Sequence, residues 1–433
     1  MNDILFLPTR YFPSISGAEF YFQRIAEILT FRFNYNVDIF TSDAIDFKAL
    51  RDPRGKVVKK NNKRYGVVNN LKINRFSVNY NTSEADALKN LKMIPSFKSL
   101  NLSDDCVKSF IKNGPYLGDL IDYFINDPDL NYKLIHTTFF PYFNLILSLM
   151  VGMQNNIPKI CTPFFHFSNP RYMDLKLIDV LKKFDLLIAC TNIEKQILIN
   201  EFKITKGKII VIPMGVDYKR FKRVHISTYN NYFFKKNYFD KKEISYKLVL
   251  FCGHKNFEKG AISILKAIPF ILQKIKEVYF VFIGPSTRAF NHEFSKIHRY
   301  KDVRIINLTP DNLSGYYDKK KLTAFKEADV YLMPSRTDAF GISFLEAWAA
   351  GNPVIGARIG ATPEVIEENV DGLLVEFNDP KDIAQKVILL LKNKKLRRKL
   401  GLNGQSKVSQ RYTWDIIARQ THFTYQSLIN NYK

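Results

Sequence analysis

Short runs of apolar residues recur along the first half of the chain, and helix-length amphipathic segments separate several of them. In segment 20–32, Phe20, Ile25, Ile28 and Leu29 recur near helical spacing. Uninterrupted apolar strands that alternate with helices are typical of a parallel, doubly wound sheet. The predicted strands of this half cover residues 4–7, 37–41, 134–137, 160–162, 186–190 and 209–212.

The alternation stops at residues 219–247, which are rich in Lys, Arg, Tyr, Phe and Asn and show no clear period. We interpret this segment as a linker or an insertion between domains. The alternation then restarts. The predicted strands cover residues 248–252, 279–283, 303–306, 330–333 and 354–357, and the predicted helices cover 261–277, 342–350, 381–391 and 395–410.

The pattern therefore predicts an α/β chain with two Rossmann-like domains in tandem. We predict a first domain over residues 1–215 and a second over 216–411, with a C-terminal helix at about 412–433 that packs back on the first. Ligands of such sheets bind outside the carboxyl ends of the strands. Two domains that face each other would bind their ligands in the cleft between them.

Composition agrees with a globular chain, because 46% of the 433 residues are hydrophobic and 24% are charged. Lysine and arginine number 65 against 41 acidic residues, which gives a net charge of +24. This excess indicates anionic partners: phosphate ligands, an anionic membrane surface or nucleic acid. Basic residues cluster at 48–75, 89–112 and 219–247. Such clusters could contact anionic lipid at a membrane surface, or they could form a solvated basic face.

The four cysteines, Cys106, Cys161, Cys190 and Cys252, lie far apart without metal-ligand spacing. The last three adjoin apolar runs, so we expect small buried side chains in a reduced cytosolic protein. We expect no signal peptide, because the pattern predicts a strand directly after the first residues. The most apolar long run, 137–153, falls short of the roughly 20 residues of a membrane-spanning helix and predicts a buried helix.

A first candidate site lies at residues 334–341, between a predicted strand and a helix that begins near Ile342. The start of a helix offers backbone N–H groups and a positive dipole end to an anion, and Gly341 lies there. Asp338 can accept hydrogen bonds from sugar hydroxyls, and the carboxylate of Glu346 suits a cis-diol such as ribose. Taken alone, the two acids would fit better as a helix cap at Asp338 and a solvated helix position at Glu346.

A second candidate lies at residues 253–260, again between a strand and a helix, where Lys259 places a cation suited to a diphosphate. In the first domain, Gly17 follows the first strand and His166 follows the strand at 160–162. His136 ends another strand, and for it we favour a satisfied core position over a place on the wall of the binding site.

The run from Phe340 to Ile355, with its Phe-Gly, Leu-Glu-Ala and Gly-Asn-Pro-Val-Ile segments, resembles the signature of the family 4 retaining glycosyltransferases, which have the GT-B fold. The family motif is Glu-x7-Glu, and Asp338 stands here for the first Glu. The resemblance implies that Asp338 contacts the donor sugar and Glu346 the nucleotide ribose. It also implies that the backbone of Phe340, Gly341 and Ile342 lies beside the sugar and diphosphate.

Residues 253–260 resemble the family's Gly-Arg-x5-Lys-Gly, although the spacing is one residue shorter. By this resemblance Lys259 neutralises the departing diphosphate. His254 stands at the arginine position, with Lys255 as the alternative cation. Gly17 matches the glycine that lets the backbone approach the donor, and His166 matches the active-site histidine.

Residues 211–221 resemble the family's interdomain segment. The resemblance is strongest over residues 248–377 and fades over 43–130, on the acceptor side.

We thus expect a hexosyltransferase that uses a nucleotide-sugar donor and a glycan, lipid-linked or small-molecule acceptor, with retention of the anomeric configuration. No metal or other cofactor is expected, since no DxD-type site stands out and Asp104-Asp105 fits a helix cap. No nucleic-acid-binding module is recognisable. The alternatives are a sugar-nucleotide epimerase of the same fold, a basic protein that binds nucleic acid or a membrane surface without catalysis, and a catalytically silent homologue.

Overall fold

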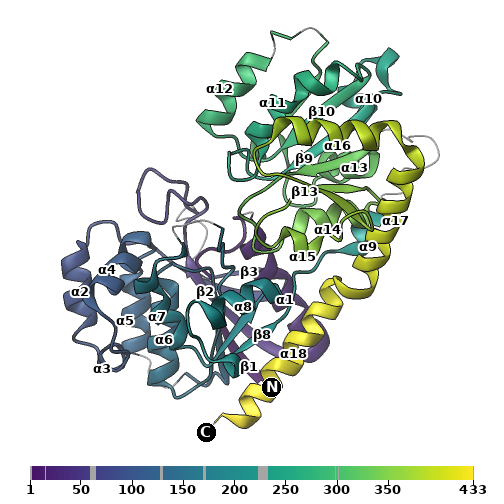
Figure 1. The fold of residues 1–433 in the computed structure, drawn as a ribbon. Helices are drawn as coiled ribbons and strands as arrows, with labels where there is room; N and C mark the ends of the chain where they lie inside the picture. The colour runs from purple at the N-terminus through teal and green to yellow at the C-terminus, as the bar shows by residue number, and fades with distance from the viewer. Residues whose placement is uncertain are drawn as a thin grey trace. The chain divides into compact units, whose positions relative to one another are not determined.

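The computed structural model describes residues 2–14, 16–58, 65–126, 130–168, 172–222, 233–297, 299–300 and 302–432. The chain divides into two compact units. The N-terminal unit comprises Met1–Pro213 together with Trp414–Lys433, and the C-terminal unit comprises Met214–Thr413. Each unit contains its own α/β layers around a predominantly parallel sheet (Figure 1).

The described part of the N-terminal unit holds an eight-stranded sheet in the order β3-β4-β2-β1-β5-β6-β7-β8. All neighbours pair in parallel except β3 and β4, and Ile4 at the centre pairs with Val37 on one side and Leu134 on the other. The strands are β1 (Asn2–Leu7), β2 (Tyr35–Ser42), β3 (Tyr65–Val68), β4 (Leu71–Phe76), β5 (Leu134–Thr138), β6 (Lys159–Thr162), β7 (Leu186–Ala189) and β8 (Ile209–Val211).

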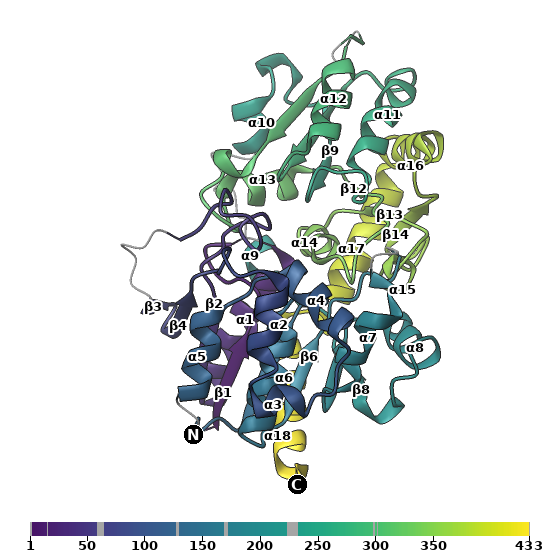
Figure 2. The same cartoon turned by 90° about the vertical axis from the view of Figure 1, so that its left-hand side faces the viewer.

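Helices cover this sheet, and a cluster of short ones fills the stretch between β4 and β5 (Figure 2). The helices are α1 (Gly17–Phe33), α2 (Glu84–Leu91), α3 (Pro95–Lys98), α4 (Asp104–Asn113), α5 (Gly118–Asn126), α6 (Asn144–Gln154), α7 (Leu175–Lys182), α8 (Asn192–Asn200) and α18 (Trp414–Asn431). The single helix predicted for 137–153 is wrong in its first part, because Pro141 lacks an N–H and α6 starts at Asn144. Likewise, Ser103 rather than Asp104 caps α4.

The C-terminal unit contains, among its described residues, a six-stranded parallel sheet in the order β11-β10-β9-β12-β13-β14. Its strands are β9 (Lys247–Cys252), β10 (Val278–Ile283), β11 (Ile305–Leu308), β12 (Val330–Met333), β13 (Val354–Ala357) and β14 (Gly372–Val375). Its helices are α9 (Tyr218–Lys222), α10 (Phe233–Tyr238), α11 (Ala261–Leu272), α12 (Arg288–Ile297), α13 (Lys319–Glu327), α14 (Ile342–Ala349), α15 (Thr362–Val365), α16 (Pro380–Lys392) and α17 (Lys394–Arg411).

Three predictions for this unit need correction. The helix expected to reach residue 277 ends at Leu272, and the strand expected at 303–306 lies two residues later. The segment 219–247 is not a plain linker, because it contains α9 and α10; its residues 223–232 lie outside the described part. The aromatic residues that obscured a period there include Phe234, which is fully buried.

The last helix, α18, belongs to the N-terminal unit and packs beside α1 (Figure 1). Trp414 and Tyr425 bury their rings against the unit, and Tyr425 reaches His136 on β5. The His136 imidazole is fully buried; its Nδ1 shares a hydrogen bond with the Tyr425 hydroxyl, and its Nε2 shares one of 2.9 Å with Thr162. His136 is therefore a satisfied core residue, as the sequence favoured.

Candidate functional site

Two loops meet at the carboxyl edge of the C-terminal sheet. Residues 253–260 follow β9 and residues 334–341 follow β12, and these strands are neighbours at the point where the strand order reverses. Gly260, with φ of 74°, ends the first loop, and an added Cβ would lie 2.3 Å from the carbonyl oxygen of Pro334. A glycine is therefore required for the two backbones to approach so closely.

Side chains also join these loops. The Lys259 ammonium donates to a carboxylate oxygen of Asp338 and, at 3.2 Å, to the carbonyl oxygen of Thr337. The Arg336 guanidinium forms a two-pronged ion pair with Glu258, at 2.6 and 2.9 Å. Two of the predicted site residues, Lys259 and Asp338, are thus in direct contact.

Helix α14 begins directly after the second loop. Gly341 is its N-cap, with φ of 94°, so the alternative that Asp338 caps the helix is wrong. Ile342 is the first helical residue, and the first-turn N–H groups of any helix lack intrahelical partners. Phe340 is buried, with its ring centroid 5.5 Å from that of Tyr412. The buried ring fixes the loop backbone that leads to the helix start.

Glu346 lies in the second turn of α14, and its side chain is only 2% exposed. Its Oε1 accepts a hydrogen bond of 2.8 Å from the Lys321 ammonium. Tyr316 is also bonded to Glu346, and burial followed by the Glu346 charge raises the pKa of the Tyr316 hydroxyl well above its ordinary value. The alternative of a solvated helix position is therefore wrong, because Glu346 is a buried, paired carboxylate.

The two candidate cations that follow Gly253 lie in different surroundings. His254 is exposed, and the pKa of its imidazole is lowered by desolvation first and then by Lys259 and Lys255. Lys255 is fully buried, and its ammonium donates to the side-chain oxygen of Asn307 and to the carbonyl oxygen of Leu308. Desolvation lowers the pKa of this ammonium to about 8. Lys255 thus anchors the loop to the end of β11.

In the N-terminal unit, Gly17 is the exposed first residue of α1, after the loop that follows β1. Arg10 fixes this loop through a buried ion pair of 2.7 Å with Glu19 and a hydrogen bond of 2.9 Å to the carbonyl oxygen of Ile45. The first turn of α1, where Gly17 lies, is therefore held close to a fixed, buried charge pair.

His166 lies in the loop that follows β6, half-buried, with its ring centroid 5.1 Å from that of Tyr172. The residue before it is held by Glu194 of α8, whose buried carboxylate accepts from the N–H of Phe165 at 3.1 Å and from the N–H of Cys190 at 2.7 Å. Glu194 thereby ties the carboxyl ends of two neighbouring strands together next to His166.

Two family models match the chain. A model described as Glycosyl transferases group 1 matches residues 234–407, and one described as Glycosyltransferase Family 4 matches residues 97–220. The chain belongs to family 4 of the glycosyltransferases. The first match contains both loops of the C-terminal unit, and the second contains His166.

Curated relatives agree with the family. An uncharacterized glycosyltransferase of Methanocaldococcus jannaschii is 31% identical over 182 residues, which are 42% of this chain and 45% of the relative. A D-inositol 3-phosphate glycosyltransferase of Corynebacterium jeikeium is 27% identical over 250 residues, which are 56% of this chain and 58% of the relative. The chain thus spans about half the length of the curated relatives that it matches.

The GT-B fold is confirmed by solved structures. Alr3699/HepE of Anabaena, crystallised in complex with UDP and glucose, superposes with a TM-score of 0.70 at 16% identity, over 98% of this chain and 99% of that chain. This family 4 glycosyltransferase therefore has the two Rossmann-like sheets that its sequence predicted.

Sequence reasoning missed Lys321. On α13, Lys321, Ala324 and Phe325 share one buried face at helical spacing, and a lysine within an apolar face is the signal that would have found it. Sequence reasoning also missed Glu194, because Thr191-x-x-Glu194 has the form of an ordinary capping box. In the structure its carboxylate instead accepts hydrogen bonds from the N–H groups of Phe165 and Cys190.

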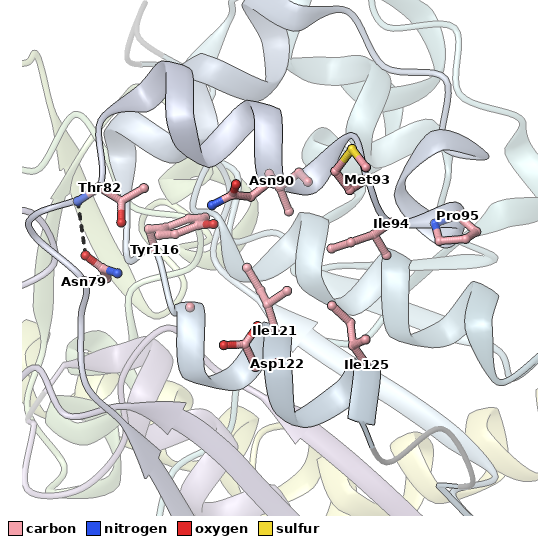
Figure 3. A pocket seen from close by; sticks show the side chains of 12 residues that line it. Asn79, Thr82, Asn90, Met93, Ile94, Pro95, Tyr116, Ile121, Asp122 and Ile125 are labelled. Atoms are coloured by element: carbon pink, nitrogen blue, oxygen red, sulfur yellow. Dashed lines mark hydrogen bonds between the residues drawn. The ribbon is translucent and has the colours of Figure 1, made fainter.

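The N-terminal unit has a cavity of about 450 Å³ in the region where the family resemblance fades (Figure 3). Asn79, Thr82 and Tyr116 lie toward one end, and Ile94, Pro95 and Ile125 lie toward the other. None of the predicted site residues lines this cavity.

Within the described residues, no group of three or more His, Cys, Asp and Glu side chains is arranged to hold a metal ion. No described helix combines the length and apolarity needed to cross a membrane.

Proposed function

We propose that the protein transfers a hexose from a nucleotide-sugar donor to an acceptor, with retention of the anomeric configuration. The contact between Lys259 and Asp338 carries this proposal, because it joins a cation suited to a diphosphate and an acid suited to a sugar at one strand edge. In this proposal residues 216–411 bind the donor, and residues 1–215 with the C-terminal helix bind the acceptor.

Each donor group has a matching protein group. Lys259 neutralises part of the charge of the leaving diphosphate. The backbone at the start of α14, at Phe340, Gly341 and Ile342, donates N–H hydrogen bonds to it. A positioned cation or hydrogen-bonding group of this kind raises the rate by a factor on the order of 10²–10³. Asp338 accepts hydrogen bonds from the sugar hydroxyls, and Glu346 accepts those of the ribose.

The remaining predicted residues act at the edges of the donor. His254 would contact the diphosphate beside Lys259, whose charge, after desolvation, helps to lower the pKa of the His254 imidazole. Gly17 lets the backbone of the N-terminal unit approach the donor sugar. His166 would hydrogen-bond the donor sugar or the acceptor from a loop that Glu194 holds through the N–H of Phe165.

The cavity of the N-terminal unit favours a lipid-linked acceptor over a small polar one. Its polar end follows β4 at the carboxyl edge, and its apolar end runs along α5 to Ile125. Met93 at the rim is 75% exposed, and the neighbouring exposed Lys89 would face anionic lipid headgroups. The acceptor would then be reached at the inner face of the cell membrane.

The acceptor proposal is tested with methyl and octyl glycosides of the same sugar. Met93→Glu should weaken use of the octyl acceptor and leave the methyl acceptor unchanged, whereas Phe31→Glu, at a position 61% exposed on α1, should affect neither. Co-sedimentation with anionic liposomes at low and high salt tests the membrane contact. Equal use of both acceptors by Met93→Glu, or no salt-sensitive co-sedimentation, would count against a lipid-linked substrate.

The transfer proposal is tested by screening nucleotide sugars for a thermal shift, then analysing products by mass with candidate acceptors. A UDP-sugar is the first donor to try, since HepE has been crystallised with UDP-glucose. An altered nucleotide sugar without any acceptor would indicate an epimerase. Salt-sensitive retention on nucleic acid without nucleotide-sugar binding would indicate a nucleic-acid-binding protein, and donor binding without product a silent homologue.

A further inference from the structure

Lys321 is a buried lysine that the transfer chemistry does not yet explain. It lies in the first turn of α13 and is 6% exposed. Its ammonium lies 3.7 Å from the ring centroid of Tyr316, 5.8 Å from that of Phe325 and 5.9 Å from that of Phe221. Aromatic faces stabilise a cation, but a buried ammonium also requires a counter-charge.

Glu346 supplies that counter-charge. The Lys321 ammonium bonds Oε1 of Glu346 at 2.8 Å, and Tyr316 bonds the same carboxylate. An ionised carboxylate has roughly four lone-pair sites. After Lys321 and Tyr316 have each taken one site, about two remain, which is the number that a cis-diol requires.

We propose that Lys321 is a positioning residue for donor recognition. Its ammonium fixes the carboxylate of Glu346, so that the remaining lone pairs point toward the ribose hydroxyls. Tyr316 completes the arrangement through its own hydrogen bond to the carboxylate. The inference rests on the proposed function, in which Glu346 binds the nucleotide ribose.

The test compares a nucleoside diphosphate with its 2′-deoxy analogue, by calorimetry, in the full-length protein. The nucleotide is the one of UDP, GDP and ADP that binds the wild type. A hydrogen bond to a charged group contributes about 10- to 100-fold in affinity, so the wild type should prefer the ribonucleotide by about that factor. Lys321→Met should lose most of this preference by weakening the ribonucleotide alone, and Lys321→Arg should retain part of it.

Lys326→Met, at an exposed position on the same helix, is the matched control and should keep the full preference. Tyr316→Phe gives a second reading if Lys321→Met does not fold, and it should reduce the preference while leaving the deoxynucleotide affinity unchanged. A variant that weakens both nucleotides by one factor has only a structural effect, which overturns the inference.

Glu346→Gln separates the two levels of the proposal. If this variant keeps the ribonucleotide preference, Glu346 is not the ribose ligand and the donor site itself is wrong. If Glu346→Gln loses the preference while the Lys321 and Tyr316 variants keep it, the donor site stands and only the positioning role of Lys321 fails.

Discussion

Lys259 and Asp338 lie 79 residues apart in the sequence and form an ion pair at the carboxyl edge of one sheet. Asp338 is one methylene shorter than the glutamate of the family motif. The shorter acid nevertheless reaches Lys259, because Gly260 lets the two loop backbones touch and the pair of Arg336 with Glu258 holds the loops together. The replacement of glutamate by aspartate therefore keeps the acid beside Lys259, the cation proposed to bind the diphosphate.

We predict that Lys259→Ala lowers turnover by about 10²–10³ while the protein stays folded, since the variant removes the cation proposed to stabilise the leaving group. The Lys259 side chain is 21% exposed, so its loss leaves no large buried cavity. Initial rates with saturating donor, paired with a thermal melt, measure the effect. Lys326→Ala is the control, and near-normal turnover in Lys259→Ala would remove this lysine from the mechanism.

Gly341→Ala should disturb the start of α14 more than an ordinary surface substitution. The φ of 94° is unfavourable for alanine, and the added Cβ would lie 2.6 Å from Cδ2 of Phe344. Strain of this kind costs roughly 1–3 kcal/mol, and the shifted N–H groups should weaken donor binding. Gly207→Ala, where an added Cβ meets no atom within 4 Å, should leave donor affinity and the melting temperature unchanged. Wild-type donor affinity in Gly341→Ala would show that the diphosphate does not contact this helix start.

Glu346→Ala and Glu346→Gln should both lose donor affinity but should differ in stability. Alanine leaves the buried Lys321 ammonium without its counter-charge, which costs about 3–5 kcal/mol, whereas glutamine still offers a carbonyl oxygen to accept from Lys321. Urea unfolding and nucleotide binding measure the two effects. Glu376→Gln, at a side chain that is 65% exposed, is the control. Equal stability of the two Glu346 variants would mean that Lys321 does not depend on this carboxylate.

The sequence was sufficient for the central strands and for the loops that follow them. Apolar runs such as 248–252 and 330–333 are buried on both faces, so their pattern is continuous and easy to read. The family resemblance assigned Lys259, Asp338 and Gly341 to one donor site, in agreement with the rule that ligands bind at the carboxyl ends of strands, and the structure brings Lys259 and Asp338 into contact.

The sequence was insufficient where elements are short or a polar residue is buried. The strand β3 and the short helix α3 each have only four residues, too few to establish a period. The local pattern alone left a solvated position open for Glu346, because its partner Lys321 lies 25 residues earlier on another helix. Pairing of that kind depends on how α13 and α14 pack, which no local pattern records.

The buried His136 predicts a pH dependence of stability in the N-terminal unit. Burial lowers the pKa of this imidazole from 6.5 to about 3. Between these values the unfolded chain binds a proton that the folded chain does not. The stability that His136 contributes is therefore present above pH 6.5 and is lost as the pH falls, by about 1.4 kcal/mol per pH unit.

His136→Gln tests this prediction, because glutamine keeps hydrogen-bonding groups for Tyr425 and Thr162 but does not titrate. The variant should be less stable than the wild type at pH 7, and the difference should shrink as the pH is lowered from 6.5 to 5. Urea unfolding at several pH values measures the difference. His292→Gln, at a side chain that is 69% exposed, should run parallel to the wild type at every pH. If the difference in unfolding free energy between wild type and His136→Gln does not change with pH, His136 has the same pKa in the folded and unfolded chains, although it is buried on β5 against α18.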